Sequence, residues 1–517
     1  MPQLAPLQTD LLIHAICFLA QAGVLLSTGI AQQGTTPPWM FPIYFILSAL
    51  TLMRIHERVP QFGTRLVYVP AAMAALMIGL CLLIDMPRAF WGFMIPRHLP
   101  IGLRALWMQL TLLLLHPDVF AKMSACFSRW HEWLQTNGYY GCKIWILAVI
   151  AVFVLWLARS QNISLDGFDW LRFTVPPKHW VLYLREPLGL LIFRAAAYWG
   201  IKLPHWDPYC SITLVTILCG VVTTFLLGRV SGWVAPKPFA APLVLLLVSC
   251  CGYTQVFAGN IEIYAVLHVG LALFLYAAMK YVRDDWPAWA PGLAFGILFC
   301  IHLSAGWWIP AFLLLPLLKY YKRGAAEKPF YDVSLLYTSA LLFIGVFWMF
   351  LLQHGYNGNV ERMVAHFFSD QVMYVGTDAA MFRPIQDYLT PDYYLTMANE
   401  FFYLAPAAVV LLPVIFLGFR RWGTVDPVLA WIGCLAFFYF AYSITWRPDR
   451  LFPIDWDLFS GLTVPAVLLF GGFVARMKVS KDAALYLLYQ ATAFSFLYLL
   501  LQLTRNHFKV TAWPMYL

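Results

Sequence analysis

Long apolar runs, separated by short polar connections, are the dominant pattern along this chain. A run of about 17–25 apolar residues is long enough to cross a bilayer as an α-helix. The pattern predicts about fifteen spans, near residues 10–31, 38–54, 66–85, 101–116, 143–158, 208–228, 238–257, 261–280, 287–302, 304–320, 333–353, 402–419, 425–444, 459–475 and 483–503. The run 101–116 is short enough to lie at the interface instead.

The segment 187–200 departs from this pattern. It is short for a span, and it places Arg194 near its middle, which gives the helix one polar stripe. Helices with one polar stripe lie in the membrane interface. We therefore predict a surface helix here rather than another span.

Composition narrows the class of protein. The chain has 517 residues, of which 62% are hydrophobic and 11% charged, whereas soluble domains are roughly 45–50% apolar and about 25% charged. This composition excludes a soluble globular protein and predicts an all-α polytopic membrane protein. The net charge of +9 does not require nucleic acid, because Lys and Arg at span ends are expected beside membrane lipids.

The basic residues also predict an orientation. Lys and Arg concentrate in the short cytoplasmic loops of membrane proteins. The basic connections fall on one side if the spans alternate, which makes that side cytoplasmic and places loops 159–207, 354–401 and 445–458 outside. These connections hold Arg54, Arg58 and Arg65; Lys319, Lys322, Arg323 and Lys328; Arg420 and Arg421; and Arg476, Lys478 and Lys481.

The chain divides into two regions. Residues 1–130 form about four spans with few polar residues, and we interpret them as accessory helices that dock a partner or close a lipid entry. Residues 131–517 form the core, with long outer loops at 159–207 and 354–401. A basic, aromatic linker from Lys122 to Lys143 joins the two regions. No internal repeat is visible, which disfavours the transporters that are built from inverted repeats.

The loop after the span that ends near Ala158 is the first candidate site. It places Asp166 and Asp169 three residues apart at the membrane surface. Acids in such loops are often only solvated, but a carboxylate there could also act as a catalytic base toward a lipid-borne substrate.

Two tight outer turns supply further polar residues. Glu262 precedes Tyr264 where the chain re-enters the membrane, and His268 lies about a turn and a half deeper on the same face. His302 begins a second turn. A carboxylate at this boundary is costly unless it is hydrated, paired or functional, whereas an isolated histidine is often a satisfied interfacial residue.

The loop 446–461 is the second concentrated site. Arg447 and Arg450 suit a phosphate, because guanidinium groups bind phosphate in a bidentate manner. Asp455 and Asp457 could hold a divalent cation such as Mg²⁺ or Mn²⁺. The alternative is a turn in which these charges pair with each other.

In order and spacing, these motifs resemble the GT-C superfamily of membrane glycosyltransferases, which use polyprenyl-phosphate-linked sugars, and within it the bacterial branch related to protein O-mannosyltransferases. The resemblance covers about 142–503. The second acid is Asp where that family more often has Glu, the first four spans lie outside its shared core, and no large soluble C-terminal domain follows. The matching motifs are Asp166-Gly-Phe-Asp169, Arg185-Glu186-Pro187-Leu188-Gly189, Glu262-Ile-Tyr264 and His302-Leu-Ser304.

The resemblance implies a GT-C-like core of about 11 helices preceded by about 4 others, in a bacterial plasma membrane. It implies an inverting glycosyl transfer at the outer face, from a polyprenyl-phosphate sugar donor to a hydroxyl of a lipid, glycan or protein acceptor. Asp166 would be the base, and Asp169 would orient the base or the acceptor, or share a cation with Asp166. Arg447 and Arg450 would bind the donor phosphate, and the substrate would contact Arg185, Glu262, Tyr264 and His302.

Other classes make different predictions. A transporter or flippase of a lipid-linked substrate moves that substrate without covalent change, and it places acids deep in the bilayer. An outer-face glycan polymerase or ligase lacks an Asp base in its first loop. A non-catalytic scaffold gives no reason for three polar clusters on one face.

Overall fold

The computed structural model describes residues 6–28, 40–83, 101–135, 142–159, 184, 186–203, 207–235, 240–259, 261–284, 286–323, 329–365, 388–422, 426–446 and 456–507. Every predicted apolar run contains helix. The elements are α1 (Pro6–Thr28), α2 (Met40–Phe62), η1 (Arg65–Val67), α3 (Tyr68–Leu83), α4 (Ile101–Leu114), α5 (Pro117–Gln135), α6 (Cys142–Leu157), α8 (Pro187–Lys202), α9 (Pro208–Val234), α10 (Ala241–Ser249), η3 (Gly252–Phe257), α11 (Tyr264–Arg283), α12 (Trp289–Ile301), η4 (Leu303–Trp308), α13 (Ile309–Leu313), α14 (Leu315–Arg323), α15 (Pro329–Tyr356), α17 (Pro391–Leu404), α18 (Pro406–Leu417), η6 (Phe419–Arg421), α19 (Pro427–Thr445), η7 (Trp456–Leu462), α20 (Thr463–Arg476) and α21 (Lys481–His507).

The fold class predicted from the sequence, an all-α polytopic membrane protein, is confirmed. Among the described residues, 7 helices are long and apolar enough to cross a membrane, or 8 if the bent pair α17 and α18 is one span. Shorter apolar helices cover Arg65–Cys81, Ile101–Leu114 and Trp289–Ile301. The chain is therefore an integral, multi-pass membrane protein.

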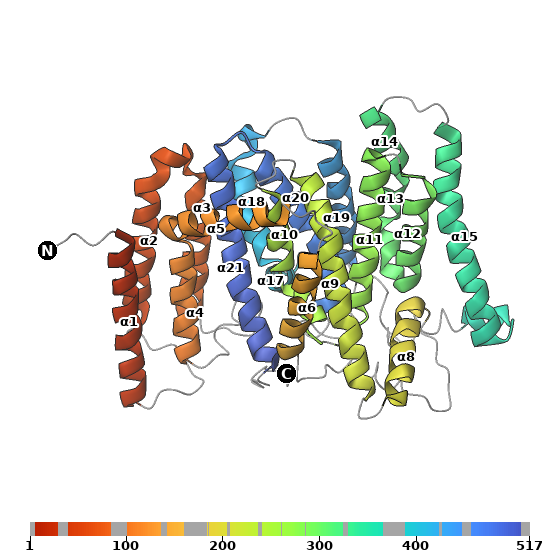
Figure 1. The fold of residues 1–517 in the computed structure, drawn as a ribbon, viewed down its shortest axis with the longest axis horizontal. Coiled ribbons are helices and arrows are strands. Elements are labelled where there is room, and N and C mark those ends of the chain that lie inside the picture. The colour runs from red at the N-terminus through yellow and green to blue at the C-terminus, as the bar shows by residue number, and fades with distance from the viewer. Residues whose placement is uncertain are drawn as a thin grey trace.

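Several runs differ from simple spans. The run 402–419 breaks between α17 and α18, which meet at 108°, because Pro406 disfavours helical backbone at Ala405 before it. The run 238–257 is a short helix, α10, followed by the 3-10 helix η3. The end of the predicted outer loop 354–401 is helical, as α17. The linker before Lys143 is also largely helical, as α5, which lies across the other helices (Figure 1).

The last long helix, α21, is the centre of the bundle. Of the most apolar 18-residue stretch of α21, 89% is buried inside the protein, whereas the corresponding stretch of α15, at the far edge, is 22% buried. It packs against α10, α18 and α20 on the core side and against α3 and α4 on the other side. The four N-terminal helices therefore continue the same bundle (Figure 1).

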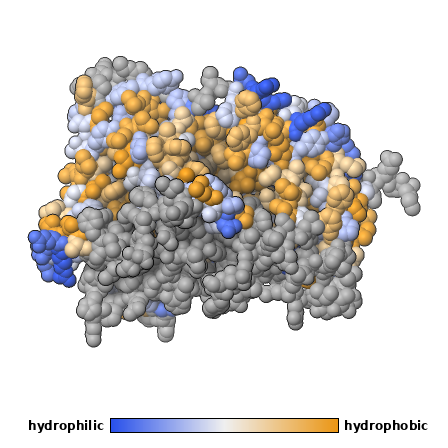
Figure 2. Space-filling view, turned by 180° about the vertical axis from the view of Figure 1, so that it is seen from behind, coloured by the Kyte–Doolittle hydropathy of each residue, from blue (hydrophilic) through white to orange (hydrophobic). Residues whose placement is uncertain are grey.

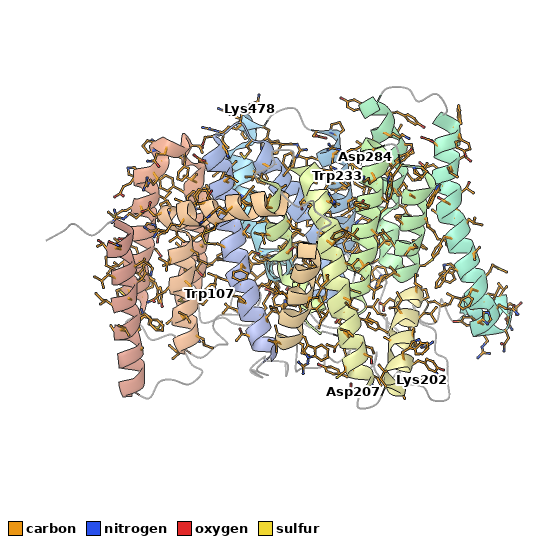
Figure 3. All side chains as sticks on the ribbon, in the orientation of Figure 1. Trp107, Lys202, Asp207, Trp233, Asp284 and Lys478 are labelled. Carbon is orange, nitrogen blue, oxygen red and sulfur yellow. The ribbon has the colours of Figure 1, made fainter. Side chains whose placement is uncertain are left out.

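The basic connections gather at one end of the bundle, which we call the basic end. Lys478 N–H donates to the Arg421 carbonyl at 2.8 Å, and the Ser480 hydroxyl donates to the Phe62 carbonyl at 2.8 Å. Lys478 and Asp284 lie at this end, whereas Lys202 and Asp207 lie at the opposite end (Figure 3). Below the basic end, the described part of the surface seen in Figure 2 is largely apolar, as a lipid-facing belt requires.

Close contact between α12 and α15 depends on two glycines spaced four residues apart. A Cβ on Gly292 would lie 2.1 Å from the Leu336 carbonyl oxygen, and one on Gly296 would lie 3.0 Å from the Ala340 carbonyl oxygen. Small residues at this spacing let two membrane helices approach to backbone contact. Gly292-Leu-Ala-Phe-Gly296 is therefore the sequence feature that specifies this helix pair.

We expect Gly292→Val to lower the free energy of unfolding by about 2 kcal/mol or more, because the new side chain meets backbone that cannot move aside. Gly345→Val on α15 is the matched control, since a Cβ at Gly345 meets nothing within 4 Å. Denaturant titration of both variants in detergent micelles measures the difference. Equal losses in the two variants would contradict the helix-contact role.

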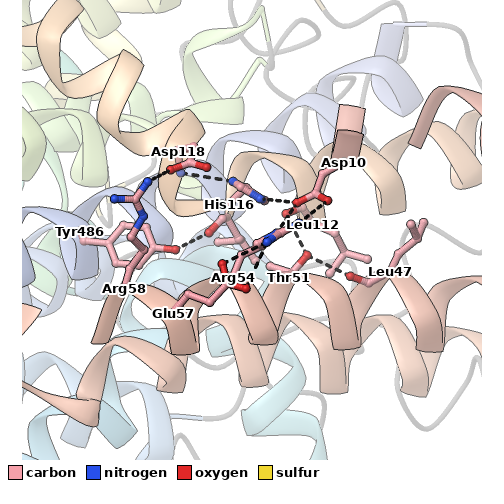
Figure 4. A network of polar contacts seen from close by, with 11 residues as sticks. Asp10, Leu47, Thr51, Arg54, Glu57, Arg58, Leu112, His116, Asp118 and Tyr486 are labelled. Carbon is pink, nitrogen blue, oxygen red and sulfur yellow. Dashed lines mark hydrogen bonds and ion pairs between the residues drawn. The ribbon is translucent and has the colours of Figure 1, made fainter. Parts of the chain in front are cut away.

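A network of charged side chains joins α1, α2 and the start of α5 near the basic end (Figure 4). The Asp10 carboxylate accepts from Arg54 Nε at 2.8 Å and Arg54 Nη2 at 3.2 Å. His116 Nε2 lies 2.9 Å from Asp10 Oδ2, while His116 Nδ1 accepts from the Asp118 backbone N–H at 3.2 Å. Since Nδ1 is the acceptor, the ring proton sits on Nε2 and points at Asp10.

The accessory helices are thus more polar inside than their sequence indicated. Their buried polar side chains include Asp10, His14, Gln21, Arg104 and His116. On α1 these residues follow the 3–4 spacing of one helix face, whereas Leu12, Ile16 and Leu19 are exposed. The apolar face of α1 is the outer one, as expected for a helix that meets lipid.

Candidate functional site

A cluster of polar and aromatic side chains lies where α11 begins and α12 ends, at the end of α11 away from Asp284 and the basic end (Figure 3), and His302 is at its centre. Helix α12 ends at Ile301, and His302 adopts an extended backbone conformation before η4 begins. Its Nδ1 accepts from the Ser304 backbone N–H at 3.0 Å, so the neutral ring carries its proton on Nε2. His302 is 3% exposed, and this capping contact holds its ring in place.

Glu186 faces the proton-bearing side of that ring. Glu186 Oε1 lies 3.0 Å from His302 Nε2, and both side chains are buried. Glu186 is the N-cap residue of α8, with Pro187 in the first turn, but its side chain makes no capping hydrogen bond. The carboxylate turns toward His302 instead.

The contact leaves two polar atoms unused. Glu186 Oε1 approaches His302 Nε2 to 3.0 Å as an electrostatic contact, and Nε2 has no hydrogen-bond partner among the described residues. Glu186 Oε2 has no hydrogen-bond partner among the described residues either. A buried donor and a buried acceptor therefore lie side by side.

The Ser304 hydroxyl extends the cluster to α19. It lies 3.2 Å from the Tyr439 hydroxyl, and the Tyr439 ring stacks on Trp308 with 4.6 Å between ring centroids. A Cβ on Gly461 would lie 2.7 Å from the Tyr439 ring. Gly461 thus allows η7 to pack directly against α19.

Glu262 and Tyr264 approach His302 from the start of α11. The Tyr264 and His302 ring centroids are 5.3 Å apart, and Glu262 is 2% exposed. The turn before them contains Gly259 at φ +73°, where a Cβ would lie 2.9 Å from Arg159 Cβ. Only glycine fits this combination of positive φ and close contact.

His268 forms the deeper part of the cluster. Its Nδ1 lies 2.6 Å from the Tyr264 carbonyl oxygen, and its Nε2 lies 3.3 Å from the Ser460 carbonyl oxygen. Both partners are acceptors, and a neutral imidazole can donate to only one of them. Tyr253 of η3 stacks on the ring at 4.7 Å between centroids, so η3, η7 and α11 meet here.

The structure brings together part of the predicted site. Tyr264 and His302 are in ring contact, and Glu262 lies two residues from Tyr264 in the same turn. Asp457 lies in η7, whose later residues reach the cluster, but its side chain is outside the described residues. The other predicted site residues also lie outside them: Asp166, Asp169, Arg185, Arg447, Arg450 and Asp455.

Sequence reasoning missed several members of the cluster. Glu186 stands beside the chosen Arg185, and the turn of α8 directs Glu186 inward. Tyr439 lies within an aromatic span without a distinguishing sequence signal. Outside this cluster, sequence analysis also missed Glu400, which is 0% exposed on α17, because it falls in the predicted outer loop 354–401.

The described cluster is suited to polar organic ligands. It combines carboxylates, an imidazole donor and tyrosine rings, which are the groups that hydrogen-bond hydroxyls and cover apolar faces. Among the described residues no group of three or more His, Cys, Asp or Glu side chains could hold a metal ion. The cation expected at Asp455 and Asp457 stays a prediction.

Comparison with known proteins gave structural matches only. No protein-family model matches the chain, and no curated protein matches it. Solved structures similar to it include ArnT from Cupriavidus metallidurans bound to undecaprenyl phosphate, with a TM-score of 0.44, 15% identity, and coverage of 64% of this chain and 59% of that one. ArnT in the apo state gives a TM-score of 0.41 at 14% identity, covering 64% of this chain and 58% of that one.

The third match is the Archaeoglobus fulgidus oligosaccharyltransferase tethered to an acceptor peptide. Its TM-score is 0.43 at 13% identity, covering 71% of this chain and 55% of that chain. The chain thus spans less than two thirds of each solved protein. Both proteins are members of the GT-C superfamily, which the sequence motifs resemble.

Proposed function

We propose that the protein is a glycosyltransferase that takes a sugar from a polyprenyl-phosphate-linked donor and transfers it to an acceptor hydroxyl. The observation that supports this most strongly is the buried cluster of Glu186, Glu262, Tyr264 and His302. It lies where α11 begins, away from the basic end (Figure 3), and a lipid-borne head group would meet the protein on that side. The outer face of a bacterial plasma membrane is the location we propose for it.

The chemistry follows from the residue types. Asp166 takes the proton of the acceptor hydroxyl as its oxygen bonds to the anomeric carbon, and the bond from that carbon to the donor phosphate oxygen breaks. The configuration inverts, and polyprenyl phosphate leaves. Asp169 orients the base, and Glu262 and His302 contact sugar or acceptor hydroxyls. Arg185 is assigned to the substrate on the resemblance alone.

Donor cleavage in liposomes tests the proposal. The full-length protein is reconstituted and supplied with a panel of radiolabelled polyprenyl-phosphate monosaccharides, and release of polyprenyl phosphate is measured. Cleavage of at least one donor, above empty liposomes, supports a transferase. Movement of intact donors between leaflets without any cleavage contradicts it and favours a flippase.

We expect Arg447→Ala and Arg450→Ala to weaken donor binding by roughly 10–100-fold each, since a charge-assisted bond to phosphate is lost. Competition by unlabelled polyprenyl phosphate in the cleavage assay measures the change. Arg420→Ala at the basic end is the control. If donor affinity stays unchanged in both loop variants, these arginines do not bind the phosphate.

A further inference from the structure

Glu186 has the placement of a ligand-binding residue rather than a capping residue. At the N-cap of α8 a carboxylate normally accepts from the first free backbone N–H groups of the helix. Glu186 makes no such bond, although its own carbonyl accepts from the Leu190 N–H at 2.9 Å. The side chain is therefore held toward His302 by packing.

Packing around α8 fixes that direction. A Cβ on Gly189 would lie 2.8 Å from the Ile263 side chain and 3.5 Å from the Ile301 carbonyl oxygen. The first turn of α8 thus rests directly on the residues that precede Tyr264 and His302. Glu186, Tyr264 and His302 reach one place from three separate elements.

One hydrogen-bond donor and one acceptor between Glu186 and His302 lack partners among the described residues. His302 Nε2 carries a proton, because Nδ1 accepts from Ser304, and this N–H has no hydrogen-bonding acceptor among the described residues. Glu186 Oε2 is a buried acceptor that receives no hydrogen bond from the described part of the chain, in a residue 6% exposed. Leaving both unsatisfied is costly.

A hydroxyl satisfies both atoms at once, because it donates one hydrogen bond and accepts others. We propose that Glu186 and His302 bind one sugar hydroxyl between them: the hydroxyl donates to Glu186 Oε2 and accepts from His302 Nε2–H. The Tyr264 ring lies beside this pair and covers a face of the sugar. This assignment rests on the proposed glycosyl transfer and makes Glu186 a specificity-determining residue.

Deoxy-sugar scanning tests the assignment. Polyprenyl-phosphate sugars that each lack one hydroxyl are compared with the parent donor in the cleavage assay, with water as the acceptor. Glu186→Gln keeps the shape of the side chain but can place a donor where Oε2 accepts. We expect it to lower kcat/KM for the parent donor by roughly 10–100-fold, and by less than about threefold for the one donor that already lacks the bound hydroxyl.

The hydroxyl has two possible sources, and a second arm separates them. Transfer to octyl glucoside, a detergent-borne sugar, reports on an acceptor hydroxyl, whereas cleavage by water reports only on the donor. A selective loss in either arm supports the assignment. Equal losses for every deoxy donor and for the acceptor, or no loss in either arm, overturn it and leave Glu186 with a structural or water-binding role.

Controls keep this test separate from the proposed function. Glu57→Gln at the basic end, where the side chain is 52% exposed, is expected to leave kcat/KM unchanged. Equal melting temperatures of Glu186→Gln and the unaltered protein exclude misfolding. If the unaltered protein cleaves no donor, the transferase proposal fails, whereas cleavage without hydroxyl-specific loss rejects only the role of Glu186.

Discussion

Asp166→Asn is expected to lower glycosyl transfer by about 10²–10⁴-fold, because proton removal by a positioned base contributes that much to a rate. Asparagine has nearly the shape of aspartate, but it cannot take the proton of the attacking hydroxyl. The acceptor oxygen would then attack the anomeric carbon while still protonated. Membrane insertion and donor binding should not change, because the arginines assigned to the phosphate are unaltered.

Two matched variants make that result specific. Asp169→Asn is expected to reduce transfer less than Asp166→Asn, since we assign Asp169 an orienting role. Asp284→Asn changes an acid at the basic end that pairs with Lys280 at 2.8 Å, and it should leave transfer intact. Single-turnover release of polyprenyl phosphate measures all three, and full activity in Asp166→Asn would contradict its assignment as the base.

The helical framework could be predicted because every apolar run that enters the bilayer must form a helix for the same reason. A chain in lipid must pair its backbone polar groups within a helix, so hydrophobic length is enough to locate α9, α11 and α21. The breaks are less visible. Pro406 lies inside the predicted span 402–419, which the structure breaks, and η3 begins at Gly252, whose Cβ would lie 1.9 Å from the Tyr403 carbonyl oxygen. Such long-range contacts have no local pattern.

Some residues of the candidate site could be predicted from the sequence, and others could not. Glu262 and His302 were identifiable because a polar residue at a span end is costly, and both are buried near the same end. Glu186 was missed because only three-dimensional packing turns its carboxylate toward the histidine. Ser460 joins through its backbone carbonyl, which no reading of side-chain types can foresee.

The buried polar contacts of the accessory helices could not be predicted from the sequence. Asp10 and Arg54 are separated by 44 residues, so neither indicates the other in sequence. Their pairing removes charge from the interior of the bundle, and Tyr486 of α21 donates to the Leu115 carbonyl beside it. Helices that seemed to be an apolar scaffold are joined to one another by buried charges and to the core by α21.

Asp10→Asn should therefore destabilise the protein by about 3 kcal/mol, within the range found when one partner of a buried ion pair is removed. Asp10 accepts from Arg54 through two bonds and faces the proton of His116. An asparagine must point its NH₂ group at one of these donors, and Arg54 loses its buried counter-charge. Glu57→Gln is the matched control, because Glu57 pairs with the same guanidinium at 3.0 Å but its side chain is 52% exposed.

Exposed pairs contribute about 0–1 kcal/mol, so the control should unfold nearly as the unaltered protein does. Titration with sodium dodecyl sulfate in mixed micelles, followed by tryptophan fluorescence, gives both free energies. Two equal losses would show that the burial of Asp10 has no energetic consequence. A loss confined to Asp10→Asn, with donor cleavage retained in the folded fraction, would establish that the accessory helices stabilise the protein without taking part in the proposed reaction.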